Sequence, residues 1–544
     1  MEFDFIIVGA GSAGCVLANR LSADGKYKVA VLEAGGKDTY PWIHIPVGYF
    51  KTMSNPKTDW MYKTEPDPGL NGRSIKWPRG KVLGGSSSIN GLLYVRGQKQ
   101  DYDGWRQLGC TGWSWEDVGP LFRRAETYEN GDKADEYRGE DGPLSVSDTT
   151  VTRQIVDDWL TSAVNAGYKR AKDYNGADQE GVALFQLTTR NGRRCSTAVA
   201  YLNPAKSRQN LTVLTKCPVE RLTFQGKRCT GLIANHNGNR VTMTARREVI
   251  LSAGALASPQ LLMVSGVGDA NDLKPHGIEV IHELKGIGKN LQDHLQARPV
   301  YKTHLPTINT EVSNIFKQGL IALQYAATRK GPMAMAASLG TGFLKTREDL
   351  ETPDIQFHIQ PFSADKIDEG PHPFSAFTAS VLQLRPESAG HMELTSADMR
   401  DYPKFHPNYL ATQTDRDTIV EGVRITRRIC DTDPVKSHII EEHQPGASVG
   451  DDYDEILEWV RNTATTIYHP TGTCKMGVDP MAVVDPRLKV IGMEGLRVAD
   501  ASIMPIIVSA NTNAPTIMIG EKASDLILED AKAAQAAPRE VENA

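Results

Sequence analysis

The pattern that most constrains the fold of this chain lies in its first 33 residues. An apolar run at residues 5–8 leads into a glycine-rich turn at 9–14, a helical stretch that reaches residue 21, and a second apolar run at 29–32 that ends on Glu33. Strand, helix and strand in this order predict a βαβ unit with two parallel strands. A chain that begins in this way is expected to build an α/β domain around a parallel sheet.

The glycines of this unit have the spacing of a dinucleotide-binding turn. Gly9 makes the tight turn, Gly11 lets the backbone approach a pyrophosphate, and Gly14 lets the helix pack against the sheet. The free N–H groups of the helix N-terminus then face the phosphates. The predicted contacts of this unit with a dinucleotide are Gly9, Gly11, Ser12, Ala13, Gly14, Glu33 and Ala34.

Glu33 narrows the choice of dinucleotide. At the tip of the second strand, its carboxylate is placed to accept hydrogen bonds from a ribose diol. The same negative charge would repel a 2′-phosphate, which disfavours NADP. The unit by itself leaves FAD and NAD open.

The composition is that of an ordinary globular protein. With 544 residues the chain is too long for one simple core, so we expect two domains or one domain with large insertions. The net charge of −5 gives no reason to expect a nucleic acid partner. No apolar run approaches the roughly 18 to 20 residues that span a bilayer, and the first strand begins so close to Met1 that we expect no secretory signal. Seven scattered cysteines without paired spacing support neither a disulfide framework nor a metal site, and favour a reducing cytoplasm.

The nucleotide domain is expected to be discontinuous along the chain. Strand-like alternation between 301 and 460 predicts a separate antiparallel sheet, and the run at 496–500 resembles a strand that returns to the first domain. Apolar residues crowd between prolines at 40–50 and suggest a lid or entry loop. The predicted division is a nucleotide domain at 1–300 and 461–530, with lid and substrate-domain segments inserted at about 40–75 and 100–190, a substrate domain at 301–460 and a flexible tail at 531–544.

Further motifs are distributed between residues 80 and 516. They are a glycine and hydroxyl cluster at 80–91 followed by Tyr94 and Gly97, and segments at 254–268, 288–294, 468–473, 498–502 and 511–516. Together with the first unit they resemble the signatures of the glucose-methanol-choline (GMC) oxidoreductases, FAD enzymes that oxidise alcohols. Within that family the chain looks most like the bacterial choline dehydrogenase and aliphatic alcohol dehydrogenase branch. The agreement spans residues 1 to about 530.

The resemblance implies a fold and a cofactor. The fold class is α/β, with a discontinuous FAD-binding Rossmann-like domain and a substrate domain whose antiparallel sheet is flanked by helices. FAD is favoured over NAD. Beyond the first unit, the implied FAD contacts are Arg79, Gly84, Gly85, Ser86, Ser87, Asn90, Gly91, Val219, Ala253, Gly254, Asp500, Ala501, Asn511 and Thr512.

The resemblance also implies the catalytic residues. An alcohol is too weak an acid to ionise unaided at neutral pH, and imidazole, with a pKa of roughly 6.5, is suited to accept its proton. His469 corresponds to this base, held beside flavin N5, and Asn511 to the residue that orients the hydroxyl. His294 is expected to serve packing or hydrogen bonding, while His358 and Tyr468 are candidates for the substrate pocket.

Two positions depart from the choline-oxidising relatives. A histidine that carries a covalent flavin link in some of them is replaced by Ile89, so we expect FAD to bind non-covalently. A glutamate that holds a quaternary ammonium aligns with Leu339, which predicts a pocket wall without that charge. A neutral primary alcohol with an apolar or aromatic body is therefore the expected substrate.

Several alternatives stay open at this point. Choline dehydrogenase or oxidase activity is the alternative within the same reaction class, and a hydroxynitrile lyase-like FAD protein or a fatty-acid photoenzyme is the alternative from another class. The electron acceptor can be oxygen, a quinone or another carrier. The motifs do not decide the oligomeric state or a peripheral contact with the inner face of a membrane, for which the segment at 40–62 is a candidate.

Overall fold

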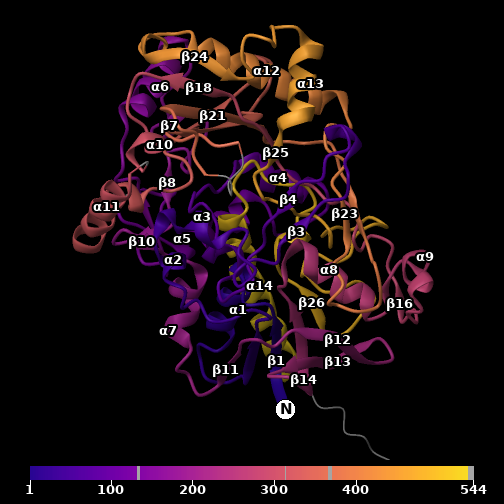
Figure 1. Ribbon diagram of the computed structural model, residues 1–544. Coiled ribbons are helices and arrows are strands. Elements are labelled where there is room, and N and C mark those ends of the chain that lie inside the picture. The colour runs from indigo at the N-terminus through magenta and orange to yellow at the C-terminus, as the bar shows by residue number, and fades with distance from the viewer. Residues whose placement is uncertain (131–134, 313, 366–369, 537–544) are drawn as a thin grey trace, which may run out of the picture.

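A mostly parallel sheet and an antiparallel sheet organise the molecule, one in its lower half and one in its upper half in Figure 1. The computed structural model describes residues 1–130, 135–312, 314–365 and 370–536. Helices and loops from both ends of the chain fill the space between the two sheets (Figure 1). This arrangement confirms the predicted α/β class with a nucleotide-binding sheet and a separate antiparallel sheet.

The lower sheet contains the predicted βαβ unit. Its strands lie in the order β11 (Leu211–Leu214), β2 (Val29–Leu32), β1 (Glu2–Val8), β14 (Asn239–Leu251), β13 (Arg228–His236) and β12 (Val219–Gln225), and β26 (Leu496–Val498) pairs with β14. The strands β11, β2, β1, β14 and β26 are parallel neighbours, whereas β12, β13 and β14 are antiparallel. All four residues of β2 are buried, as expected for a strand that is covered on both faces.

The two ends of the described chain meet on this sheet. Helix α1 (Ser12–Leu21) packs against α14 (Asn513–Ala536), and the two lie side by side in the centre of Figure 1. Arg20 donates two hydrogen bonds to Glu521, at 2.9 and 2.8 Å. The predicted late strand and C-terminal helix are present as β26 and α14.

The upper sheet is antiparallel throughout. Its strands lie in the order β24 (Ile439–Gln444), β18 (Val300–Thr303), β21 (Ala376–Gln383), β20 (Ile355–Gln360), β19 (Gly340–Leu344) and β7 (Gly181–Leu184), and β17 (Leu295–Ala297) pairs with both β21 and β25 (Thr465–Thr466). Helix α12 (Gln413–Cys430) packs on β21. Strands β7, β17 and β25 lie outside the predicted range of 301–460, so this sheet uses more of the chain than expected. The domain limits stay a prediction.

Two segments differ from the sequence-based expectation. The segment at 40–53 forms short helices, α2 (Pro41–His44) and α3 (Tyr49–Thr52), and prolines stand at the first positions of α2 and of the 3₁₀ turn Pro46–Gly48 that joins them. Residues 531–536 of the predicted flexible tail belong to α14, which continues to Ala536. Residues 537–544 lie outside the described residues.

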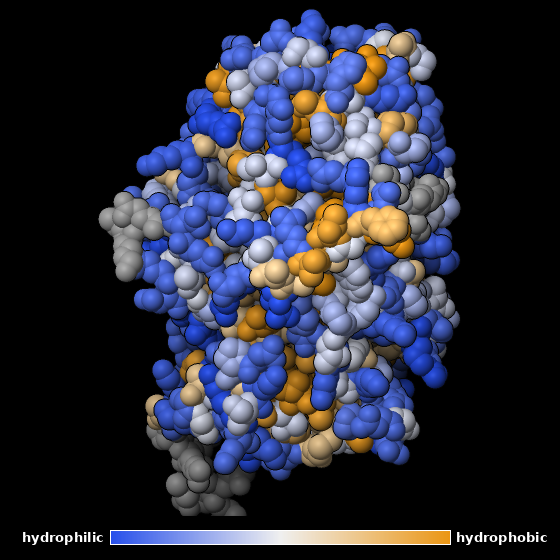
Figure 2. All heavy atoms as spheres, turned by 60° about the vertical axis from the view of Figure 1, so that its left-hand side comes forward, coloured by the Kyte–Doolittle hydropathy of each residue, from blue (hydrophilic) through white to orange (hydrophobic). Residues whose placement is uncertain are grey.

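Helix α11 (Ile315–Thr328) is the element with the most exposed apolar side chains in the described part of the chain. Ile315, Phe316, Leu320 and Leu323 are between 67 and 81% exposed. Figure 2 shows apolar side chains gathered at mid-height on this face, at the level of α11. Among the described residues, no helix combines the length and the apolar character needed to cross a membrane.

Candidate active site

A cavity of about 1230 Å³ lies between the two sheets. Its wall includes the N-terminal ends of α1, α8 (Gly254–Val264) and α14, together with the glycine cluster at 80–91 and residues of β20. Ligand sites typically measure roughly 300 to 1,000 Å³, so this cavity has room for a dinucleotide together with a small substrate. The helix N-termini offer unpaired N–H groups, which suit the phosphates of a dinucleotide.

Backbone atoms form the wall near the first glycine turn. A Cβ atom on Gly9 would lie 2.5 Å from the Ser252 carbonyl oxygen, and one on Gly14 would lie 1.9 Å from the Gly9 carbonyl oxygen. A Cβ atom on Gly85 would lie 2.7 Å from the Gly11 Cα atom. The two glycine turns therefore touch each other, and only glycine allows this close approach.

Most of the predicted FAD contacts line this cavity. Three do not: Gly14, Gly84 and Ser87 lie behind the wall. The predicted contacts that line the cavity are Gly9, Gly11, Ser12, Ala13, Glu33, Ala34, Arg79, Gly85, Ser86, Asn90, Gly91, Val219, Ala253, Gly254, Asp500, Ala501, Asn511 and Thr512.

Gly84 and Ser87 hold the two glycine turns in place. We call the part of the cavity wall that these turns form the dinucleotide cradle. The Gly84 N–H donates to the Ala10 carbonyl at 2.8 Å and so ties one glycine turn to the other. The Ser87 hydroxyl donates to the Gly84 carbonyl at 2.6 Å and pairs with the Thr197 hydroxyl at 2.9 Å. Because these atoms are already engaged, the prediction that Ser87 donates to the flavin is not supported.

The acidic residues of the cradle hold its loops in place. Glu33 accepts a hydrogen bond from the Ala10 N–H at 3.1 Å, and burial raises the pKa of its carboxyl to about 7. Asp500 accepts from the Gly254 N–H at 2.8 Å and from the Ser258 hydroxyl at 2.6 Å. Burial raises the pKa of Asp500 as well. Both side chains reach the cavity, where they can also meet a ribose or ribityl hydroxyl.

The predicted catalytic pair meets at this cavity. Asn511 Nδ2 lies 3.3 Å from His469 Nε2, although 42 positions separate the two residues. His469 follows β25, and Asn511 lies just before α14. Their exposed fractions are 7 and 9%, so both side chains are largely shielded from bulk solvent.

His294 determines which nitrogen of His469 can act as a base. His294 Nε2 lies 3.0 Å from the Leu384 carbonyl oxygen, which only accepts, so this nitrogen carries the proton. In neutral His294 the other nitrogen, Nδ1, accepts from His469 Nδ1 at 3.0 Å. His469 is thus protonated on Nδ1 and keeps a lone pair on Nε2. Gln356 donates to Asn511 Oδ1 at 3.4 Å, which turns Asn511 Nδ2 toward that lone pair.

Burial keeps the histidines of the site neutral. It lowers the pKa of His469 well below 6.5, and the positive charge of Arg79 lowers it further. The pKa of His294 falls to about 4 and that of His358 to about 3, in both cases mainly through burial. A neutral imidazole can accept a proton at pH 7, whereas an imidazolium cannot.

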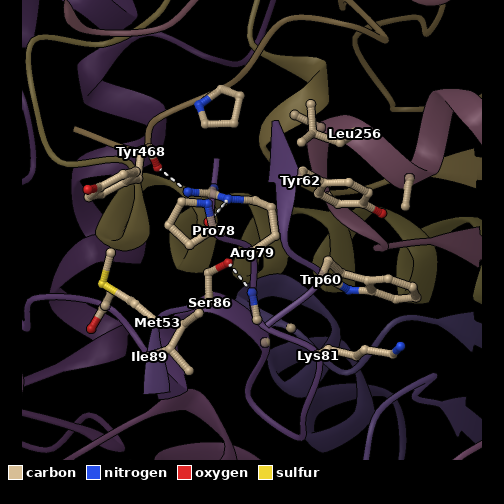
Figure 3. Close-up of a pocket in the computed structure, with 18 of the residues that line it drawn as sticks. Met53, Trp60, Tyr62, Pro78, Arg79, Lys81, Ser86, Ile89, Leu256 and Tyr468 are labelled. Carbon is tan, nitrogen blue, oxygen red and sulfur yellow. Dashed lines mark hydrogen bonds between the residues drawn. The ribbon is translucent and has the colours of Figure 1, made fainter. Parts of the chain in front are cut away.

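Tyr468 has a left-handed backbone immediately before the base. Its φ angle is 73°, a conformation that costs a bulky residue about 1 to 3 kcal/mol. The Arg79 guanidinium donates to the Tyr468 carbonyl at 2.5 Å, and the Tyr468 N–H donates to the Thr466 hydroxyl at 2.6 Å. Figure 3 shows Arg79 reaching this carbonyl, with Met53 and Ile89 beside the Tyr468 ring. The strained turn directs the Tyr468 side chain into the cavity wall.

Asp293 also stabilises the turn that contains Tyr468 and His469. Its carboxylate accepts from the His469 N–H at 2.7 Å, from the Thr466 hydroxyl at 2.6 Å and from the Tyr409 hydroxyl. Sequence reasoning missed the roles of Asp293 and His294 at the base. The motif at 288–294 contained both residues, but nothing in it pointed to a partner 175 positions away.

Only two of the three predicted substrate-pocket residues line the cavity in the structure. His358 and Tyr468 line the cavity. Leu339 does not, which corrects the prediction for this residue. It is fully buried, its N–H donates to the Ile359 carbonyl and its carbonyl accepts from the Phe185 N–H. Leu339 is therefore part of the sheet interior, and the cavity wall beside it is formed by Ala337, His358 and Gln360.

One group of metal-type ligands lies outside the cavity. His391, Glu393 and His406 on strands β22 (His391–Glu393) and β23 (Lys404–His406) have ligand atoms within 4.8 Å of one another. His391 and Glu393 are also paired at 3.2 Å. The cavity wall contains none of the three.

An enzyme that oxidises its substrate needs a group that accepts electrons and a group that accepts the proton. The cavity brings a dinucleotide cradle to a neutral histidine, so fold and site define the class as a dinucleotide-dependent oxidoreductase. Models of the GMC oxidoreductase family match residues 3–296 and 386–520. The chain belongs to the GMC oxidoreductase family, whose members are FAD flavoenzymes.

Named relatives cover nearly the whole chain. Alcohol dehydrogenase (acceptor) from Pseudomonas putida is 42% identical over 533 residues, which are 97% of this chain and 96% of the relative. Mitochondrial choline dehydrogenase from Mus musculus is 43% identical over 537 residues, which are 97% of this chain and 89% of the relative. Formate oxidase from Aspergillus oryzae, solved in a variant made to study FAD modification, is 28% identical and superposes with a TM-score of 0.91 over 98% of this chain and 99% of that one.

The residues of the cavity fit FAD. The glycine turns allow the close backbone approach that a pyrophosphate needs, and the N-termini of α1, α8 and α14 offer N–H donors around it. Glu33 reaches the cavity at the end of β2, where a ribose diol is bound in dinucleotide sites of this type. The residues that would hold the cofactor are the lining residues already given for the cradle.

Proposed function

We propose that this protein oxidises an alcohol to the aldehyde in an FAD-dependent reaction, with His469 as the general base. The observation that carries the proposal is the unprotonated Nε2 of His469, which faces Asn511 in the same cavity as the dinucleotide cradle. FAD, when bound, supplies the acceptor for the hydride that leaves the carbinol carbon. The alcohol and choline dehydrogenases among the relatives support the same reaction type.

The residues of the site divide the proton transfer between them. The substrate hydroxyl donates to His469 Nε2 and accepts from the Asn511 amide, which holds the carbinol carbon in one orientation. When Nε2 takes the proton, His469 becomes cationic and its Nδ1–H strengthens the hydrogen bond to His294. A positioned general base typically contributes about 10² to 10⁴ in rate, and orientation adds a further share.

The flavin is proposed to bind non-covalently. Ile89 stands where some relatives carry the linking histidine, and its side chain is buried with Tyr49 and Met53 against the cavity. An isoleucine has no atom that can form such a bond. Acid precipitation should release yellow flavin into the supernatant, whereas colour that stays in the pellet contradicts this part of the proposal.

Two substitutions test the mechanism. His469→Ala should keep FAD but slow flavin reduction by at least about 10², because the base is lost. Asn511→Ala should lose less, since Asn511 orients the hydroxyl and takes no proton. Both rates are measured by anaerobic stopped-flow mixing with a panel of alcohols. A His469→Ala rate equal to the wild-type rate removes His469 from the mechanism, and a larger loss for Asn511→Ala reverses the two roles.

The alternative activities have their own discriminators. Choline is the alternative substrate, and because Leu339 does not line the pocket, the argument from Leu339 against choline no longer holds. Comparing kcat/KM for choline, hexanol and benzyl alcohol decides between them. Release of cyanide from a hydroxynitrile without flavin reduction would indicate a lyase, and light-dependent release of CO₂ from a fatty acid would indicate a photoenzyme. Reoxidation by oxygen or a quinone identifies the acceptor.

A further inference from the structure

Arg298 lies in the wall of the cavity. The residue directly follows strand β17 and is only partly buried, and its side chain lines the cavity. Among the residues that the structure describes, Arg298 makes no hydrogen bond and no ion pair. A guanidinium carries five N–H donors, and leaving a charge without a partner in a partly desolvated site is costly. Within the described part of the chain, the wall thus holds a cation that no side chain pairs with.

Two phenols stand near this guanidinium. Tyr49 and Tyr468 line the same cavity, and Tyr468 packs against the small apolar cluster that contains Tyr49. In the described residues, neither of their hydroxyls has a hydrogen-bond partner. Burial raises the pKa of both phenols, and the charge of Arg298 opposes the rise in both. The two hydroxyls therefore stay protonated and can donate hydrogen bonds beside the cation.

Among the described residues, the acid that interacts with Arg298 is Asp365, and it does not form an ion pair with Arg298. Asp365 also lines the cavity and interacts with Arg298 electrostatically. Its carboxylate instead accepts from Gln444 at 2.8 Å and pairs with His372 at 3.2 Å. Asp365 is exposed to solvent, where its charge is screened.

The strand that precedes Arg298 relates this residue to the base. His294 contacts His469, and Gln296 and Arg298 follow at alternate positions and both line the cavity. His294 and Arg298 flank the three-residue strand β17, and an extended segment of four residues spans about 13 Å. An anion on the Arg298 guanidinium is therefore separated from the base by the length of several carbon–carbon bonds.

Part of the cavity wall is apolar. Phe50, Ala337 and Phe362 line the cavity together with the rings of Tyr49 and Tyr468. Phe50 lies against Tyr49 and Phe362, with ring centroids 4.2 and 5.2 Å away. Such a wall suits a carbon chain or an aromatic ring.

We propose that the substrate is an alcohol with a carboxylate at its far end, and that Arg298, Tyr49 and Tyr468 bind this carboxylate. The carbinol group lies at His469 and Asn511, an apolar or aromatic body lies along Phe50 and Ala337, and the anion lies at Arg298. This inference rests on the proposed alcohol oxidation and gives it a substrate class. It replaces the expectation of a neutral alcohol, and it disfavours choline, because Arg298 repels a quaternary ammonium.

Matched substrates test the charge preference. 4-(Hydroxymethyl)benzoate and 4-(hydroxymethyl)benzamide have nearly the same shape and differ in charge, and 6-hydroxyhexanoate and 6-hydroxyhexanamide form an aliphatic pair. Wild-type holoenzyme should oxidise each acid with a kcat/KM about 10- to 100-fold above that of its amide, the range for charge-assisted hydrogen bonds. An equal or higher kcat/KM for both amides overturns the inference.

Substitutions at Arg298 locate the effect. Arg298→Gln should lower kcat/KM for the acids by at least about 10-fold and change that for the amides by less than about 2-fold, and Arg298→Lys should recover part of the loss. FAD content and the flavin spectrum check that each variant is folded, and Lys302→Gln, on the next strand and outside the cavity wall, is the matched control. An equal loss for acids and amides overturns the inference.

A binding measurement covers the case in which Arg298→Gln does not fold. 4-Methylbenzoate has no carbinol group, so it can bind without reacting. It should perturb the flavin spectrum of wild-type holoenzyme at a concentration at least about 10-fold below that of 4-methylbenzamide, and the reverse order overturns the inference. If no alcohol of any charge reduces the flavin while 4-methylbenzoate binds, the proposed oxidation fails and the anion site stands.

Discussion

At the scale of residues, the site depends on a base that burial keeps neutral. An exposed histidine is partly protonated near neutral pH, which removes its ability to accept a proton. His469 avoids this because burial lowers its pKa well below 6.5. The hydrogen bond from His469 Nδ1 to His294 then leaves the reactive lone pair on Nε2, on the side of Asn511.

The depressed pKa predicts the pH dependence of flavin reduction. Protonated His469 cannot take the hydroxyl proton, so the rate at saturating alcohol should fall on the acid side only. Because its pKa lies well below 6.5, the rate should stay level from about pH 9 down to about pH 6.5 and decrease at lower pH. Stopped-flow reduction across this range measures the profile. An acid limb with a midpoint at or above 6.5 would contradict the neutral buried base.

At the scale of elements, the short pair β17 and β25 places the catalytic side chains. His294 and Asp293 stand just before β17, Tyr468 and His469 stand just after β25, and the pairing of these strands brings the four together. The pairing is only two residues long on each strand, and such a strand has no periodicity that a sequence can reveal.

The difference between long periodic segments and short strands explains which elements the sequence predicted and which it did not. Strands β1 and β2 and helix α1 are long apolar or periodic segments, and they lie where the sequence predicted them. The glycines of the cradle were recognised because a close backbone approach permits no other residue. The sequence wrongly predicted that Leu339 lines the pocket, and it did not point to Arg298. Which residues line the cavity depends on which face of a strand packs against the neighbouring elements, and the sequence does not show this.

Removing His294 should test the link between this strand pair and the base. His294→Ala deletes the acceptor for His469 Nδ1–H, so we expect flavin reduction to slow about 10- to 100-fold. His294 is neutral above its own pKa of about 4, and its hydrogen bond to His469 Nδ1–H stabilises the imidazolium, so its loss should move the acid limb to lower pH. His282→Ala is the matched control, because His282 bonds the Ile491 carbonyl outside the cavity wall. A slower variant with an unchanged pH profile would mean that His294 acts only on stability.

At the scale of the whole molecule, the cavity exists only where the beginning and the end of the chain meet. The N-termini of α1 and α14 both line it, and Ser12 donates to Asn513 at 2.8 Å across their junction. The two helices are held further along by Glu521, which is fully buried and bonded to Arg20, Arg124 and Tyr201. Cofactor binding and the packing of the chain ends are therefore expected to be coupled.

Glu521→Ala should weaken both properties together. Removing one partner of a buried ion pair costs about 3 to 5 kcal/mol, and we expect the lower end because Arg20 and Arg124 are partly exposed. The melting temperature should fall, and the variant should lose FAD during gel filtration, because the loosened helices no longer hold their N-termini at the cradle. Asp525→Ala on the same helix is the control, since its partly exposed pair with Arg124 is worth about 0 to 1 kcal/mol. A Glu521→Ala variant that melts at a lower temperature yet keeps all its FAD would show that the cradle does not depend on the junction of the two helices.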